Sequence, residues 1–130
     1  MTESIVKNKS YDFALRIIKL YLFLTDKKHF EIANQIVRAG TGLGANIEEA
    51  LAGFSKKDFT AKMSIASKEA RETHYWLRLI RDSGLVGINQ VKYLVSESET
   101  LVKILTSIVK TSSAAGKITT KNQKLKTKNS

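Results

Sequence analysis

The chain has 130 residues and a formal net charge of +10 at pH 7, with 42% hydrophobic and 26% charged residues, which is typical of one folded domain rather than a disordered chain. It contains no cysteine, which excludes disulfides, thiolate metal ligands and cysteine nucleophiles, and no proline, which permits long unbroken helices. No stretch approaches about 18 uncharged apolar residues, so we expect no membrane span and predict a cytoplasmic protein.

The first predicted helix spans about residues 10–25. Its apolar residues repeat at spacings of 4, 3 and 4, which places them on one helix face: Phe13, Ile17, Leu20 and Leu24. Ser10 is the expected N-cap, because a serine hydroxyl accepts a hydrogen bond from a backbone N–H of the first turn.

The second predicted helix spans about residues 29–53 and contains Gly40, Gly42 and Gly44. Interior glycines cost a helix about 0.5–1 kcal/mol each relative to alanine. Their spacing superficially resembles a dinucleotide-binding fingerprint, but that motif requires a preceding strand, and none is predicted here. We therefore expect one continuous or locally irregular helix in which the glycines allow a neighbouring helix to pack closely.

The third and fourth predicted helices carry the clearest heptad patterns. Residues 56–83 place apolar or small side chains at spacings of 4-3-4-3-4-3: Phe59, Met63, Ala66, Ala70, Thr73, Leu77 and Ile80. Ser55 and Asp58 resemble a capping box, and Gly84 is the expected C-terminal stop. Residues 89–112 repeat similarly, at Val91, Leu94, Ser98, Leu101, Leu105 and Ile108.

Short connections between these segments make neighbouring helices antiparallel. The predicted fold is all-α: an up-down-up-down antiparallel four-helix bundle over residues 1–113, followed by a disordered, lysine-rich tail over residues 114–130. From Lys110 onward the chain has six lysines and no acidic residue. More than half of the net charge therefore lies at this end, where it serves either nucleic-acid binding or solubility.

Several segments between residues 34 and 77 resemble a known family. They read Asn34-Gln-Ile-Val-Arg-Ala39, Gly44-Ala-Asn-Ile-Glu-Glu-Ala50, Ser55-Lys-Lys-Asp-Phe59, Ile65-Ala-Ser-Lys-Glu-Ala-Arg-Glu-Thr73 and Trp76-Leu77. Together they are similar to the four-helix-bundle proteins encoded within intervening sequences of bacterial 23S ribosomal RNA genes, a group that resembles the accessory variability determinant of diversity-generating retroelements. The resemblance covers about residues 10–110. It implies a homo-oligomer, with five copies expected, and no enzyme activity.

The chain departs from this family pattern at two places. Val37 precedes a single Arg38 where many relatives carry paired arginines, and Gly44 stands where many carry proline. The lost arginine weakens an RNA role at that position.

Basic residues supply the candidate nucleic-acid site, because lysine and arginine neutralise phosphates. The candidates are Lys56, Lys57, Arg71, Arg78, Arg81, Lys117, Lys121 and Lys124. Tyr75 and Trp76 lie among them and are able to stack on unpaired bases, although burial is the favoured role for Trp76. The alternative for the arginines is an ordinary solvated helix face.

Arg38 and Glu72 are predicted to form an ion pair. In antiparallel helices that turn near Phe54, residues whose numbers sum to about 108–110 face each other, which sets Arg38 opposite residues 70–72 and within reach of Glu69. The competing interpretation points Arg38 outward as an RNA contact.

We expect no metal, no cofactor and no enzyme activity. The glutamates of the middle helices lack the Glu-x-x-His spacing of a di-iron bundle, so salt bridges are the favoured role for Glu48, Glu49, Glu69 and Glu72. The chain has two histidines, and no serine is paired by spacing with His29 or His74.

The leading hypothesis is a non-catalytic oligomeric bundle that binds structured RNA. The alternative is an oligomeric scaffold that binds a protein partner, with the basic surface serving solubility or an acidic partner. Apolar residues outside the main stripes predict the oligomer interface, because surplus exposed apolar area usually marks an interface. They are Ile18, Tyr21, Ile32, Leu43, Val95, Val102 and Ile104.

Overall fold

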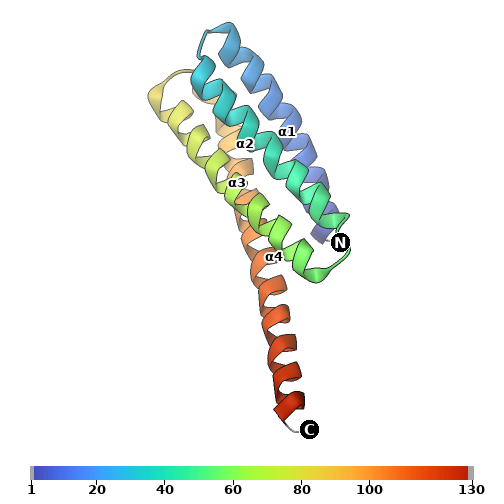
Figure 1. The fold of residues 1–130 in the computed structure, drawn as a ribbon. Helices are drawn as coiled ribbons and strands as arrows, with labels where there is room; N and C mark the ends of the chain where they lie inside the picture. Colours follow the sequence, from blue (N-terminus) through green and yellow to red (C-terminus); the bar gives the residue numbers. More distant parts are fainter. Residues whose placement is uncertain (1, 129–130) are drawn as a thin grey trace.

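The chain folds into four helices (Figure 1). The computed structural model describes the backbone of residues 2–128 and the side chains of residues 2–114. In chain order the helices are α1 (Thr2–Asp26), α2 (Phe30–Leu51), α3 (Lys56–Ser83) and α4 (Ile88–Lys128). Each helix packs against the next, and α4 returns to α1 with the sparsest contact of the four pairs. This arrangement confirms the predicted all-α four-helix bundle.

The core follows the predicted heptad positions. The largest fully buried side chains come from all four helices: Phe13, Ile17, Leu24, Ile36, Leu43, Ile47, Met63, Leu77, Ile80, Leu101 and Leu105. Each apolar side chain of this size removed from water contributes about 1.5–3 kcal/mol, so the stripes account for the bundle. Leu43 and Val95 lie in this core, so their predicted place on a second apolar face is wrong.

The glycine-rich part of α2 is helical and serves close packing with α1. A Cβ atom at Gly40 would lie 2.8 Å from Cγ2 of Ile17 on α1, which is too close for any side chain larger than hydrogen. Gly40 therefore lets the two helix backbones approach each other. The helix has no preceding strand in the described chain, so the dinucleotide-binding geometry is absent there.

Both ends of α3 are capped by the residues that the sequence predicted. Ser55 Oγ accepts a hydrogen bond from the backbone N–H of Asp58 at 3.0 Å, and Gly84 has a left-handed φ of 72°. The predicted start of the first helix is wrong, because α1 begins at Thr2 and buries Ser10 within it. The Ser10 hydroxyl instead donates to the Lys7 carbonyl at 3.0 Å.

Helix α4 is longer than the sequence pattern predicts. The hydroxyls of Thr60, near the start of α3, and Ser112 contact each other, which marks the end of the bundle along α4. Figure 1 shows α4 continuing past the other three helices, and it ends at Lys128. The apolar pattern stops near Ser112 because packing stops there, but extending an existing helix avoids the cost of a new nucleus. The prediction that residues 114–130 form a disordered tail stays a prediction, because the side chains from residue 115 onward lie outside the described part.

Candidate nucleic-acid interface

The first turn of α3 carries two exposed lysines, Lys56 and Lys57, directly after the Ser55 N-cap. The N-terminal end of a helix has a positive electrostatic potential. A lysine there therefore lowers helix stability, by about 0.3–1 kcal/mol. Helix stability therefore does not account for this pair, and both side chains are available to an anion.

Two exposed arginines lie further along α3. Arg71 donates from Nη2 to the Thr106 hydroxyl on α4 at 2.8 Å, and the guanidinium carbon of Arg78 lies 5.9 Å from the centre of the Tyr75 ring. Among the described side chains, neither arginine forms an ion pair with a carboxylate. Both guanidinium groups therefore retain a net positive charge at the border of α3 and α4.

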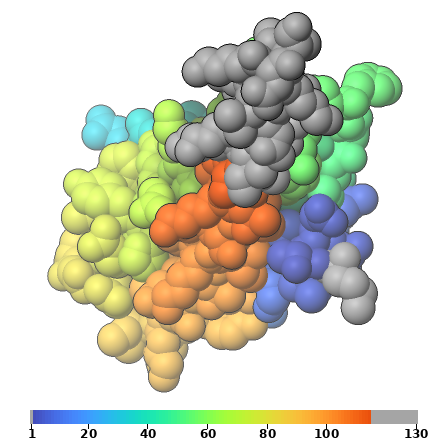
Figure 2. Space-filling model, turned by 90° about the horizontal axis from the view of Figure 1, so that it is seen from below, coloured from blue at the N-terminus to red at the C-terminus, as the bar shows by residue number. Residues whose placement is uncertain are grey.

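Helix α4 adds lysines beside this border. Lys103 and Lys110 are exposed and lie three residues before and four residues after Thr106, so all three share one helix face. Figure 2 shows α4, in orange, exposed at the surface between α1, in blue, and α3, in yellow-green. We call the exposed cations along this border the basic α3–α4 edge: Lys56, Lys57, Lys68, Arg71, Arg78, Lys103 and Lys110. Of these, Lys103 forms an ion pair with Glu99 on the same helix, at 3.5 Å.

Arg81 differs from the other predicted arginines. Its Nε and Nη2 atoms donate to the two carboxylate oxygens of Asp82 at 2.7 and 3.3 Å, and this contact holds the pKa of Asp82 below its usual value. The carboxylate largely neutralises Arg81, so this residue contributes less to the edge than Arg71 or Arg78.

His74 lies between Arg71 and Arg78 on the same face of α3. Burial is the main cause that lowers the pKa of His74 below 6.5, and the charge of Arg78 lowers it further. Arg81 acts in the same direction, whereas Glu99 on α4 opposes them. The lowered pKa agrees with a positive potential at this edge.

Two carboxylates of α3, those of Glu69 and Glu72, lie on its opposite flank, against α2. We call this the α2–α3 groove, and its charged residues are Arg38, Glu49, Lys62, Glu69 and Glu72. Arg38 contacts Glu72 and lies 3.7 Å from Glu69, and Lys62 Nζ lies 2.8 Å from Glu49. The structure therefore contains the ion pair predicted from the antiparallel packing of the two helices.

Neighbouring side chains hold the arginine of this groove in place. Arg38 also donates to the Gln35 side chain at 3.0 Å, and the Trp76 indole N–H donates to Glu72 at 3.2 Å. Trp76 is thus half-buried and engaged with a carboxylate, as expected for a packing role rather than base stacking. Burial is the main cause that raises the pKa of Glu69, followed by the adjacent charge of Glu72.

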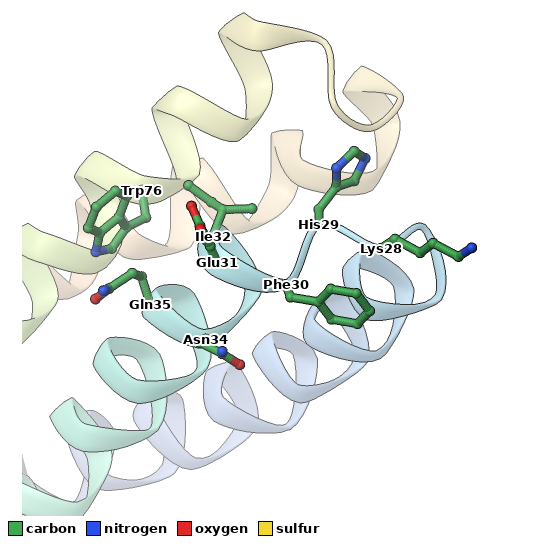
Figure 3. A pocket seen from close by; sticks show the side chains of 8 residues that line it. All are labelled: Lys28, His29, Phe30, Glu31, Ile32, Asn34, Gln35 and Trp76. Carbon is green, nitrogen blue, oxygen red and sulfur yellow. The ribbon is translucent and has the colours of Figure 1, made fainter.

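A wide hollow of about 920 Å³ opens beside the start of α2 (Figure 3). Trp76 and Gln35 lie at one end of it, and Lys28 extends away at the other. The polar groups of its lining do not converge on a common point, so the hollow does not indicate a ligand. Within the part of the chain that the structure describes, three or more metal-ligating side chains cluster nowhere.

The family model for the 23S rRNA-intervening sequence protein matches residues 2–107, which is most of the chain. The chain belongs to this family. A solved relative is a protein of unknown function from the S23 ribosomal protein family of Bacteroides thetaiotaomicron VPI-5482. It shares 42% sequence identity, covers 85% of this chain and 99% of its own, and superposes with a TM-score of 0.79. We found no match among curated proteins.

The structure gathers predicted and unpredicted cations at one edge. Sequence analysis proposed Lys56, Lys57, Arg71 and Arg78 and counted Lys110 in the basic C-terminal segment, but it missed Lys103. A usable signal existed, because Lys103 and Lys110 are one heptad apart, as are Lys110 and Lys117. The side chains of the predicted Lys117, Lys121 and Lys124 lie outside the described part. None of the described helices is long and apolar enough to cross a membrane.

Proposed function

We propose that this chain is a non-catalytic cytoplasmic protein that assembles into a homo-oligomer and binds structured RNA through the basic α3–α4 edge. One observation carries the proposal: the cations on the two flanks of α3 have different partners. Carboxylates pair with Arg38 and Lys62 in the α2–α3 groove, whereas Arg71 and Arg78 have no carboxylate partner among the described side chains.

Arginine and lysine contacts of this kind neutralise phosphates. They position a nucleic acid without reading its bases, so we expect recognition of shape rather than sequence. Binding must then weaken steeply with added salt, because each neutralised phosphate releases bound counterions. Family membership is compatible with this role, since the family's description names an intervening sequence of 23S rRNA.

The test compares two adjacent lysine pairs at opposite ends of the bundle. Replacing Lys56→Gln and Lys57→Gln should lower the affinity for a structured RNA and flatten the slope of log affinity against log salt by about 0.7–0.9 per lost contact. The matched control replaces Lys27→Gln and Lys28→Gln, which removes the same charge between α1 and α2. Equal effects of both pairs would mean that overall charge, and not the edge, determines binding.

A second observation supports self-association. Four large apolar residues of α1 are exposed on the face opposite the core, at spacings of 4, 3 and 4: Tyr11, Leu15, Ile18 and Leu22, with exposed fractions of 65%, 47%, 40% and 58%. This spacing is the same as that of the core seam, so the face fits another helix. An exposed apolar stripe of this length is unusual on a monomer.

Light scattering tests the oligomer. We expect the unaltered protein to have a mass well above the 14.5 kDa of one chain. The double variant Leu15→Lys and Leu22→Lys should approach that monomer mass. The control variant Ile65→Lys and Leu79→Lys, at exposed apolar sites on α3, should not. A monomer mass for the unaltered protein contradicts the proposed assembly.

The alternative, a scaffold for a protein partner, predicts different material after purification at low salt. An RNA-binding protein should co-purify with nucleic acid and show a raised ratio of absorbance at 260 nm to that at 280 nm. A protein scaffold should show the ratio of pure protein together with one stoichiometric partner.

A further inference from the structure

The turn between α2 and α3 presents a phenylalanine to solvent. Phe54 has an exposed fraction of 106%, the highest among the large apolar residues whose side chains the structure describes. Burial of a phenylalanine side chain is one of the larger contributions to folding, and turns ordinarily hold glycine or small polar residues instead. Phe54 contributes no such burial, so packing within the chain does not account for a large apolar side chain at this position.

Hydrogen bonds fix the backbone on both sides of Phe54. Before it, the backbone N–H of Gly53 donates to the Ala50 carbonyl at 3.2 Å. After it, the Ser55 hydroxyl accepts from the backbone N–H of Asp58 at 3.0 Å. Figure 1 shows this turn at the end of the bundle past which α4 continues. Because the turn is already ordered, a ligand that contacts the ring has little backbone entropy to remove.

Two lysines follow Phe54 at once along the chain. Lys56 and Lys57 are exposed, and neither forms an ion pair with a carboxylate among the described side chains. The carboxylate of Asp58 lies against the backbone of the turn, since a Cβ atom at Gly53 would be 2.8 Å from its Oδ2 atom. The exposed ring is therefore followed by two positive charges that no described carboxylate neutralises.

Two other exposed aromatic rings of the described chain already have partners. The guanidinium carbon of Arg16 lies 4.3 Å from the centre of the Tyr93 ring. The Tyr75 ring meets Trp76 edge-on, with 5.2 Å between the ring centres. Phe54 differs from both, because its exposure leaves the two faces of its ring open to a flat ligand.

We propose that Phe54 stacks on an unpaired base of the RNA while Lys56 and Lys57 contact the phosphates beside that base; the inference rests on the RNA binding proposed above. Bases in loops, bulges and ends stack on aromatic side chains, whereas a base inside a duplex has its faces covered by neighbouring bases. The ligand class is therefore a structured RNA with an unpaired loop or bulge. Every base has a flat face, so this contact selects unpaired bases without selecting a sequence.

A protein partner fits this site less well than a nucleotide does. Phe54 is the only large apolar residue between Leu51 and Phe59, which are both partly buried. The centre of a protein interface combines several apolar side chains and is depleted of charged ones. A single ring beside two cations instead matches the two parts of a nucleotide, a flat base and a charged phosphate.

The experiment compares three RNAs that differ in their unpaired bases: a hairpin with an unpaired loop, the same hairpin with an abasic loop, and a blunt duplex of the stem sequence. The abasic loop keeps the phosphates and removes the base faces. The unaltered full-length protein should bind the intact hairpin at least about fivefold more tightly than the abasic one, the smallest effect typical of one stacked base. Equal affinity for the two hairpins contradicts the base site.

Variants of Phe54 separate stacking from apolar contact and from charge. Phe54→Ala and Phe54→Leu should both lose the preference for the intact loop, whereas Phe54→Trp should keep it, because stacking requires a flat ring. The slope of log affinity against log salt should not change, since no phosphate contact is lost. The melting temperature should not change either, because the side chain is fully exposed.

The chain offers a matched control at the opposite end of the bundle. Phe30 has an exposed fraction of 54% and follows the exposed Lys27 and Lys28, so Phe30→Ala removes an exposed phenylalanine near two lysines. This variant should keep the preference for the intact loop. Equal effects of Phe30→Ala and Phe54→Ala would overturn the assignment of the base to Phe54.

The remaining outcomes distinguish this site from the proposed function. If Phe54→Ala lowers the molecular mass in light scattering without RNA, the ring lies between copies of the chain and the base site is overturned. If Phe54→Ala binds all three RNAs like the unaltered protein while Lys56→Gln with Lys57→Gln weakens binding, the base site fails and RNA binding by the edge stands. No binding of any RNA by the unaltered protein overturns both proposals.

Discussion

The α2–α3 groove and the basic α3–α4 edge lie on opposite flanks of the same helix, yet their charges are arranged differently. In the groove, Arg38 is shared between two glutamates and Lys62 pairs with Glu49. At the edge, Arg71 donates to a neutral hydroxyl, and Arg78 lies against an aromatic ring. Paired charges hold helices in position, whereas cations without a carboxylate remain available to a polyanion.

The largest expected effect comes from removing the lysines that follow the edge along the chain, without altering the edge or the groove. Deletion of residues 116–130 takes away Lys117, Lys121, Lys124, Lys126 and Lys128. If all five engage phosphates, the slope of log RNA affinity against log salt should flatten by about 3.5–4.5. The melting temperature should not change, because the deletion begins after the Thr60–Ser112 contact. An unchanged slope would exclude this segment from the binding surface.

The next effect tests whether the two flanks have separate roles. Arg38→Ala should lower the free energy of unfolding by about 1 kcal/mol, since the side chain is half exposed and leaves two carboxylates unpaired. Arg71→Ala should change it by less than about 0.5 kcal/mol. RNA affinity should fall more in Arg71→Ala than in Arg38→Ala. Denaturant unfolding and RNA titration of both variants check this, and loss of RNA binding with unaltered stability in Arg38→Ala would reverse the assignment.

His74 offers a smaller effect that reports the potential of the edge. Its pKa is lower in the folded state than the 6.5 of an unperturbed histidine, so the unfolded chain binds the proton more readily. The stability contributed by neutral His74 is complete above pH 6.5 and falls as the pH drops below it. Arg78→Gln should raise the His74 pKa, as should a bound RNA. Titration of the His74 ring signals by NMR measures both, and insensitivity to Arg78 would argue against a positive edge.

The smallest expected effect concerns the pH dependence of stability that Glu69 in the α2–α3 groove contributes. The pKa of Glu69 is raised above 4.5, so its protonated form stabilises the fold below that pH, and this contribution is lost as the pH rises through the folded-state pKa. Glu69→Gln mimics the protonated form. It should leave stability at pH 7 within about 1 kcal/mol of the original or slightly higher, and remove this part of the pH dependence. Thermal unfolding at pH 4, 5 and 7 is the measurement, and a large loss at pH 7 would mean that the charged form is needed.

Heptad spacing predicted the core of the bundle because burial and helix geometry both act on neighbouring positions. The stripe from Phe13 to Leu24 and that from Met63 to Ile80 are buried as expected. The Arg38–Glu72 pair could also be predicted from the sequence. A short turn between two antiparallel helices largely determines which of their residues face each other. The caps at Ser55 and Gly84 could be predicted because they depend on local hydrogen bonding and local backbone conformation, which the residue type itself favours.

Other features required the assembled structure. The apolar pattern marked where packing ends near Ser112, but it could not show that α4 continues to Lys128, because extending an existing helix avoids the cost of a new nucleus. Leu43 was expected on an outer face and is fully buried, because its exposure depends on how α2 is rotated against two neighbours. The basic α3–α4 edge likewise depends on how the helices are rotated against each other. The sequence by itself determined how many cations this protein carries and their order along each helix, whereas the packing of α3 against α4 decided which of them lie side by side and which are neutralised by a carboxylate.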